Sequence, residues 1–137
     1  MTSSTRSCEP RDPVLGCGVD CEELARFAPM LAAETHPMPL VFTRAEVDHA
    51  RSLPSPARAL CACFCAKEAV FKALGAPYNF TDCELFLSAD DTAELRLSPS
   101  LAAEHGVGGA TVEILDVEEA DGAVMAVVVL FASPVAP

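Results

Sequence analysis

The stretch CFCAKEAVFKALG, residues 63–75, decides the fold, because it ends the longest predicted helix of the chain. Pro56 suits the first turn of that helix, Ser55 can cap it, and Gly75 is a typical residue just past a helix end. Between Ser55 and Leu74 the only charges are Arg58, Lys67, Glu68 and Lys72. So little of this surface is suited to water that we expect the helix to be buried against a sheet.

The sequence on either side of the helix predicts an α+β fold, an antiparallel sheet packed on one long helix. Upstream, VLGCGVD reads as a buried strand ending at Asp20, followed by an amphipathic helix over residues 21–34. Thr43 and Glu46 form a capping-box pattern that opens a short helix. Downstream we expect strands over 80–88 and 93–98, a short helix over 98–106, and a hairpin of strands 109–118 and 123–132 with a turn near Asp121 and Gly122. We expect residues 1–13 to form a flexible tail and residues 14–137 a single domain.

Composition favours a soluble, cytoplasmic protein. The chain has 137 residues, of which 51% are hydrophobic, and its first fifteen residues lack the apolar core of a signal peptide. The longest apolar run, Ala123 to Ala132, is well short of the about 20 residues needed to cross a membrane. The seven cysteines are odd in number, and the run Cys61, Cys63, Cys65 would splay its side chains on a helix. We therefore expect small buried thiols rather than a metal site.

The charge is unevenly distributed and excludes one class of partner. Residues 1–75 carry 8 basic and 9 acidic side chains, whereas residues 76–137 carry 1 basic and 11 acidic ones, which together give the net charge of −11. A nucleic-acid-binding protein needs the opposite sign. The acidic half can simply be a solvated face that aids solubility.

The charges inside the long helix have two readings. Phe64, Glu68 and Lys72 lie at steps of four and share one stripe, which is either a solvated Glu–Lys pair or the wall of a site. Asp20, at the end of the first strand, either caps the next helix or offers an oxygen to a hard cation. If the strand end meets the helix, Asp20 and Glu68 can hold Mg²⁺, and Lys72 would face a phosphate.

Two motifs resemble those of a known family. GCGVDCEEL (16–24) and FCAKEAVFKALG (64–75), with FTRAEV between them, resemble the signature motifs of the 4′-phosphopantetheinyl transferases in their short holo-[acyl-carrier-protein] synthase form. The resemblance implies that phosphopantetheine passes from coenzyme A to a serine of an acyl carrier protein or carrier domain, with release of 3′,5′-ADP. It also implies Mg²⁺ held by Asp20 and Glu68, and a homotrimer that completes its sites at subunit interfaces.

The resemblance also suggests roles for further side chains. Glu68 or a bound water would take the serine proton, and Lys72 would stabilise the leaving phosphate. Lys67 would meet a phosphate or an adjoining subunit, unless it is merely solvated. Arg58 is a weaker candidate for binding the 3′-phosphate of the nucleotide.

The chain departs from this family in two respects. The expected Ser-x-Ser-His-like segment near the penultimate strand is missing, and His105 is either a substitute or an ordinary helix C-terminal residue. Short synthases also offer acidic carriers a basic surface, and here only Arg26, Arg44 and Arg51 are available for one. The carrier is then an unusual one, such as a domain of a polyketide or fatty-acid megasynthase. The alternative is a catalytically silent binding or assembly module of the same fold.

Overall fold

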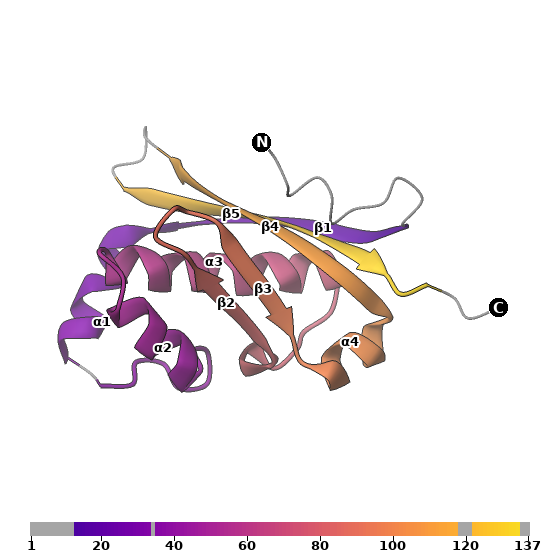
Figure 1. Cartoon of the computed structure of the whole chain (residues 1–137), viewed down its shortest axis with the longest axis horizontal. Helices are drawn as coiled ribbons and strands as arrows, with labels where there is room; N and C mark the ends of the chain where they lie inside the picture. Colours follow the sequence, from indigo (N-terminus) through magenta and orange to yellow (C-terminus); the bar gives the residue numbers. More distant parts are fainter. Residues whose placement is uncertain (1–12, 34, 118–121, 135–137) are drawn as a thin grey trace.

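The computed structural model describes residues 13–33, 35–117 and 122–134, arranged as five strands and four α-helices with two short 3-10 turns (Figure 1). The elements are, in chain order, β1 (Val14–Glu23), η2 (Leu24–Arg26), α1 (Ala28–Ala33), α2 (Arg44–Arg51), α3 (Pro56–Leu74), η3 (Phe80–Asp82), β2 (Cys83–Leu87), β3 (Ala93–Leu97), α4 (Pro99–His105), β4 (Val107–Val117) and β5 (Ala123–Ala132). The predicted tail and the predicted turn at Asp121 fall outside the described residues, apart from Pro13 and Gly122.

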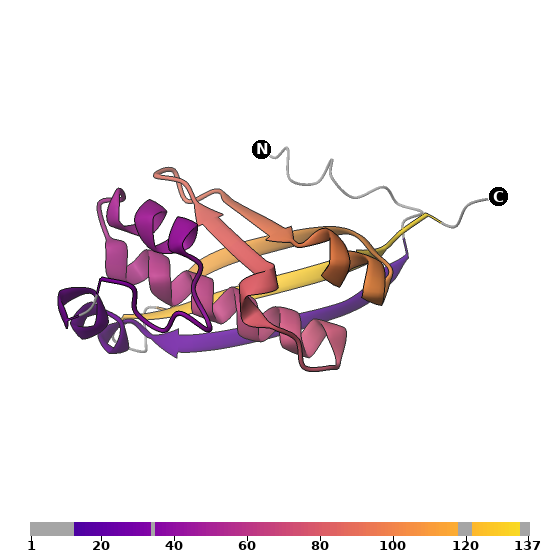
Figure 2. The same cartoon turned by 90° about the horizontal axis from the view of Figure 1, so that it is seen from below.

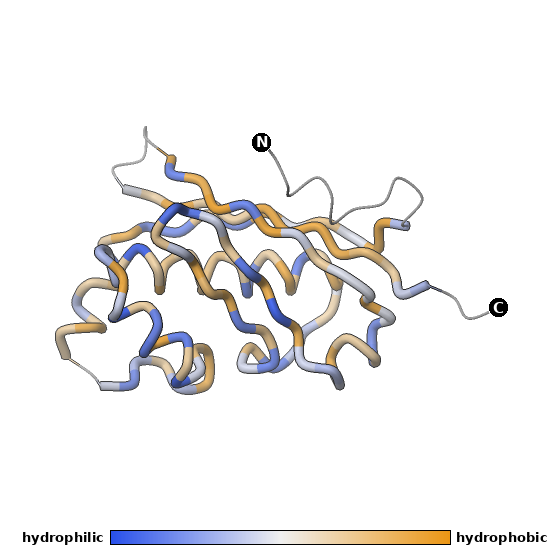
Figure 3. The backbone as a smooth tube through the Cα atoms, viewed as in Figure 1, coloured by the Kyte–Doolittle hydropathy of each residue, from blue (hydrophilic) through white to orange (hydrophobic). Residues whose placement is uncertain are grey.

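The strands form two antiparallel sheets with α3 between them. One sheet has the order β1-β5-β4, and the other is the β2-β3 hairpin. Helix α3 lies along the inner face of the three-stranded sheet, while β2 and α2 pack on its other side (Figures 1 and 2). Apolar residues run along the three-stranded sheet, as the hydropathy colouring of Figure 3 shows. The predicted α+β class is confirmed.

Helix α3 has the boundaries that its sequence predicts. Pro56 occupies the first turn, and Gly75 closes the helix in a left-handed conformation with φ of 71°. Ser55 stands at the N-cap, but its side chain makes no capping hydrogen bond. In α2 the capping box is present in full, with Thr43 and Glu46 each bonding to the other's backbone N–H. Among the described residues, no helix is long and apolar enough to cross a membrane.

The segment after Asp20 differs from the prediction. Pairing with β5 continues to Glu23, so Asp20 lies inside β1, opposite Ala126, and caps no helix. The predicted helix over 21–34 is divided into η2 and the short α1, because the strand takes its first residues and Pro29 suits only a first helical turn. The carboxyl group of Asp20 is therefore not needed as a cap.

The cysteine run confirms the predicted core role. Cys61, Cys63 and Cys65 are all buried. The thiol of Cys65 donates to the Val124 carbonyl of β5 at 3.2 Å, whereas that of Cys63 donates to Leu85 in β2 at 3.4 Å. Alternate cysteines thus fill the two opposite sides of α3.

Candidate active site

Two glycines bring β1 unusually close to α3. A Cβ atom on Gly16 would lie 2.1 Å from the carbonyl oxygen of Ala73, and one on Gly18 would lie 1.9 Å from that of Ala69. Two residues of a strand advance by about 6.6 Å and four residues of a helix by about 6 Å, so the two elements stay in register. Asp20 lies two residues further along β1, where the Lys72 side chain reaches it and where its charge acts on Glu68.

Asp20 and Lys72 make direct contact. The Lys72 ammonium lies 3.2 Å from Oδ1 of Asp20 and donates to the carbonyl of Val19 at 2.8 Å. The second carboxylate oxygen of Asp20, Oδ2, is buried and has no hydrogen-bond partner. A buried oxygen without a partner is costly, and at a carboxylate it is suited to receive a cation.

Two further carboxylates belong to the same cluster. Burial, and next the charge of Asp20, raise the pKa of Glu68, which Lys72 and Arg26 partly oppose. Burial and Asp20 likewise raise the pKa of Glu22, whose carboxylate is held by Arg26 at 2.8 Å. An open pocket of about 450 Å³ lies beside Glu22 and Arg26. The three carboxylates of the cluster therefore outnumber its two cationic side chains, those of Lys72 and Arg26.

Lys67 does not join this cluster. Its side chain is 0% exposed, and its ammonium is bound to Glu46 at 2.9 Å and to the carbonyls of Phe80 and Cys83. It lies on the face of α3 that packs on β2, so no surface is left for a phosphate. The expectation of a solvated Lys67 is wrong, because the side chain is 0% exposed. The expectation of a cofactor-binding Lys67 finds no support in this chain, because three local acceptors take all three of its N–H donors.

Arg58 is separated from the cluster as well. It lies ten residues before Glu68, which is about 15 Å along the helix. Its guanidinium is paired with Asp116 of β4 at 2.9 Å and with Asp91 of the β2-β3 turn at 2.8 Å. Carboxylates thus occupy the donors that a 3′-phosphate would need, and the structure does not support a nucleotide-binding Arg58.

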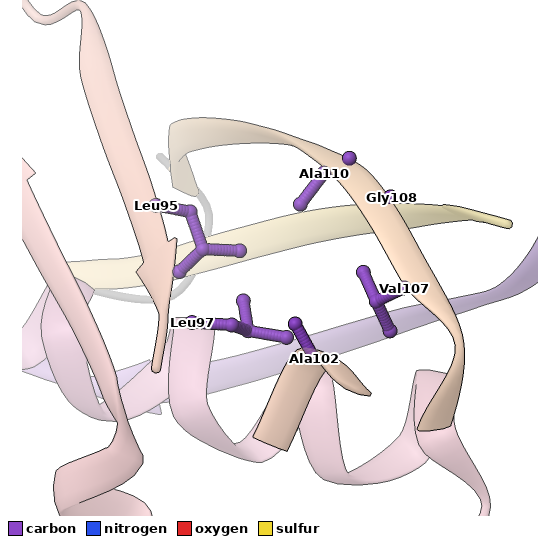
Figure 4. Close-up of a pocket in the computed structure, with 7 residues that line it drawn as sticks. Leu95, Leu97, Ala102, Val107, Gly108 and Ala110 are labelled. Atoms are coloured by element: carbon purple, nitrogen blue, oxygen red, sulfur yellow. The ribbon is translucent and has the colours of Figure 1, made fainter. Parts of the chain in front are cut away.

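The C-terminal half offers two other features, neither of which joins the cluster. His105 is the last residue of α4, with Glu104 at 3.7 Å, which fits an ordinary helix end better than a nucleotide contact. A pocket of about 150 Å³ lies between β3, α4 and the start of β4 (Figure 4). Its lining is uncharged and consists of Leu95, Leu97, Ala102, Val107, Gly108, Gly109 and Ala110.

The arrangement matches a known family. A family model described as "4'-phosphopantetheinyl transferase superfamily" matches residues 16–127, which include most of β1, all of α3 and the cluster between them. The chain belongs to this superfamily. Within the transferases it is of the holo-[acyl-carrier-protein] synthase type.

Two curated holo-[acyl-carrier-protein] synthases are similar along most of the chain. The holo-[acyl-carrier-protein] synthase of Salinispora arenicola is 34% identical over 118 residues, 85% of this chain and 97% of that protein. The synthase of Frankia alni is 40% identical over 92 residues, 66% of this chain and 74% of that protein.

Solved transferases share the fold. The synthase from Neisseria meningitidis superimposes with a TM-score of 0.69 at 23% identity, covering 85% of this chain and 98% of that chain. The Helicobacter pylori synthase, in complex with coenzyme A, gives 0.66 at 20% identity, covering 83% and 98%.

Glu22 is the residue of this transferase's cluster that the sequence alone does not single out. In CEE, residues 21–23, only the side chain that faces α3 can join Asp20. Alternation along β1 makes that residue Glu22, since Asp20 and Glu22 share a face. Glu22 could be assigned to the cluster from the sequence only if β1 were known to continue past Asp20.

Proposed function

We propose that this chain transfers the 4′-phosphopantetheine group from coenzyme A to a serine of an acyl carrier protein or carrier domain. The observation that carries the proposal is the convergence of Asp20, Glu68 and Lys72 where β1 crosses α3. A cytoplasmic location and a single domain over residues 14–137 stay predictions.

The cluster fits a magnesium ion. Asp20 has a buried oxygen without a partner, and burial, followed by the nearby charge of Asp20, raises the pKa of Glu68. No group of three or more His, Cys, Asp or Glu side chains in the described ranges is arranged to hold a metal by itself. Magnesium typically takes one or two carboxylates and completes its shell with water and substrate phosphates. Asp20 and Glu68 would hold it, with Glu22 beside them, and the bound ion would neutralise the charge of the pyrophosphate.

The remaining steps belong to the chain's own side chains. Glu68, with its raised pKa, accepts the proton of the carrier serine as the serine oxygen bonds to the β-phosphorus of coenzyme A. The bond from that phosphorus to the oxygen of the leaving nucleotide breaks, and 3′,5′-ADP departs. Lys72 is 53% exposed and reaches this region from the next turn of α3, so its ammonium stabilises the charge on the leaving phosphate.

We also propose that the chain acts as a homotrimer. The outer face of the three-stranded sheet, turned away from α3, is largely apolar; Leu15, Val19 and Leu115 on it are each more than 40% exposed. Val19 lies opposite Val127, and Leu115 lies opposite Met125, so the apolar side chains are contiguous across the strands. An exposed patch of this kind marks an interaction surface. Residues of a second and third copy packed on this face would also contact coenzyme A, which Lys67 and Arg58 of the same chain do not.

Transfer is tested directly by mass. The purified chain is incubated with coenzyme A, magnesium chloride and an apo carrier protein, and the carrier should gain about 340 Da, the mass of the added group. Omission of magnesium should prevent the gain. A carrier that stays unmodified, with a well-characterised synthase modifying it under the same conditions, would favour the catalytically silent module instead.

A further inference from the structure

We infer that Lys67 and Glu46 form a buried positioning pair. The pair fixes the rotation of α3 about its own axis, so that Glu68 faces Asp20. The inference rests on the proposed function, because it assigns a task to that function's carboxylate. It gives Lys67 no contact with substrate.

The pair is fully satisfied by its surroundings. Both side chains are 0% exposed. The Lys67 ammonium has three acceptors, namely Glu46 and the carbonyls of Phe80 and Cys83. The Glu46 carboxylate accepts from Lys67 and also from the backbone N–H groups of Thr43 at 3.0 Å and Leu85 at 2.8 Å. Each partner therefore has one preferred position.

These bonds join four segments at one point of α3. Glu46 belongs to α2, Leu85 to β2, and Phe80 to the η3 turn. The hydroxyl of Tyr78 adds a bond to the backbone carbonyl of Lys67 at 2.8 Å. Lys67 is thus held by both its side chain and its main chain, one residue before Glu68.

The opposite side of the helix is fixed by β1. Gly16 and Gly18 lie against Ala73 and Ala69, within the turns that follow Glu68. Consecutive helical residues are about 100° apart, so when Lys67 faces β2, Glu68 is turned toward the β1 side, where Asp20 lies. A helix that is packed on one side only could rotate about its axis. The Lys67–Glu46 pair prevents this rotation next to Glu68.

A pair that serves only stability predicts a different result from a pair that positions Glu68. In the first case, variants melt at lower temperature, but every folded molecule binds magnesium and reacts normally. In the second, the folded molecules themselves bind magnesium weakly and turn over slowly. Supporting side chains behind metal ligands typically change affinity or activity by about 10–100-fold.

The experiment compares Glu46→Gln and Lys67→Met with Thr43→Val, all well below their melting temperatures. Glu46→Gln keeps the size of the side chain and removes the charge that faces Lys67, so it remains informative if Lys67→Met does not fold. Thr43→Val is the matched control, because it removes the hydroxyl that caps α2 and donates to Glu84 at 2.6 Å but keeps both Lys67 and the Glu46 carboxylate. Magnesium affinity is measured by calorimetry with magnesium chloride, and kcat and both KM values by carrier mass.

We expect Glu46→Gln to weaken magnesium binding and lower kcat by about tenfold or more, with the KM for the carrier unchanged. Thr43→Val should lower only the melting temperature. Parental magnesium affinity and kcat in folded Glu46→Gln would overturn the inference. A parent that neither binds magnesium nor modifies the carrier would instead overturn the proposed function, and the inference with it.

Discussion

The carboxylate of Asp20 is only partly paired. It is mostly buried, pairs with Lys72 through one oxygen, and has no hydrogen-bond partner for the other. Burial of an incompletely paired charge opposes folding, so the Asp20 carboxylate does not serve to stabilise the fold.

Asp20→Asn should therefore separate activity from stability. The amide keeps the shape but removes the charge that would hold magnesium, so transfer should fall by about 100-fold or more. The melting temperature in metal-free buffer should stay the same or rise, and the increase that magnesium gives the parent should disappear. Carrier mass gain and thermal melts measure the two effects; full activity in the variant would remove Asp20 from the metal site.

Glu68 makes a prediction about pH. Its pKa is raised in the folded chain, by burial first and by Asp20 second. The folded state thus binds the proton more tightly than the unfolded one, so this contribution to stability is present below the ordinary carboxyl pKa and is lost as pH rises through the raised value. Glu68→Gln should melt higher than the parent at pH 7 in metal-free buffer, and the difference should vanish near pH 4. A variant that melts lower at pH 7 would contradict this.

At the residue scale, the sequence predicts those positions whose partners follow from local spacing. Phe64, Glu68 and Lys72 share a face by helical geometry, and Asp20 follows from its strand. The role of Lys67 depends on Glu46, 21 residues away, and that of Arg58 on Asp116, 58 residues away. Their neighbours are set by how the elements pack, which no local pattern contains.

At the scale of elements, the crossing of β1 and α3 is the contact on which the site depends. Small residues on both sides let the two backbones touch, since Gly16 and Gly18 face Ala73 and Ala69. The long helix, its two ends and both hairpins could be predicted from periodicity and turn residues. The length of β1 could not, because it is set by pairing with β5, about a hundred residues later in the chain.

Gly18→Ala should break this crossing. Its new methyl group would lie 1.9 Å from a backbone oxygen that a helix cannot move aside, so we expect a loss of about 3 kcal/mol or more in the free energy of unfolding. Gly109→Ala is the matched control, because a Cβ there meets nothing within 4 Å. That change should stay within about 1 kcal/mol of the parent. Urea unfolding measures both, and equal effects would show that the close approach is unimportant.

At the scale of the whole molecule, two faces are proposed to bind other proteins. The first is the outer face of the three-stranded sheet, which would bind further copies of the chain. Leu115→Lys places a charge on this apolar surface and should turn the proposed trimer into a monomer with greatly reduced transfer. Ala103→Lys, on exposed α4, should leave assembly unchanged. Light scattering distinguishes one chain of 14.4 kDa from three. A parent that is monomeric and fully active would contradict the proposed interface.

The second face is the carrier surface, where the structure narrows the choice of basic residues. The Arg26 guanidinium is paired with Glu22 and stacks over Phe64, so changing it would also disturb the cluster of Asp20, Glu22 and Glu68. Arg44 and Arg51 lie seven residues apart on α2, which places both exposed side chains on one face of that helix. The Arg51 guanidinium also donates to the backbone carbonyls of Leu31 and Thr35, each at 3.4 Å, which are neutral acceptors. An acidic carrier should therefore be steered by α2.

The double variant Arg44→Glu with Arg51→Glu tests this steering. Surface charges act mainly on encounter and are screened beyond about 8–10 Å at physiological salt, so the KM for an acidic carrier should rise about fivefold at low salt and much less at high salt. The KM for coenzyme A should stay nearly constant. Arg96→Glu, on β3 in the acidic half, is the control and should change neither constant. If the carrier KM does not move, docking lies elsewhere, and the acidic strands β2 to β4 would call for a partner that carries basic residues.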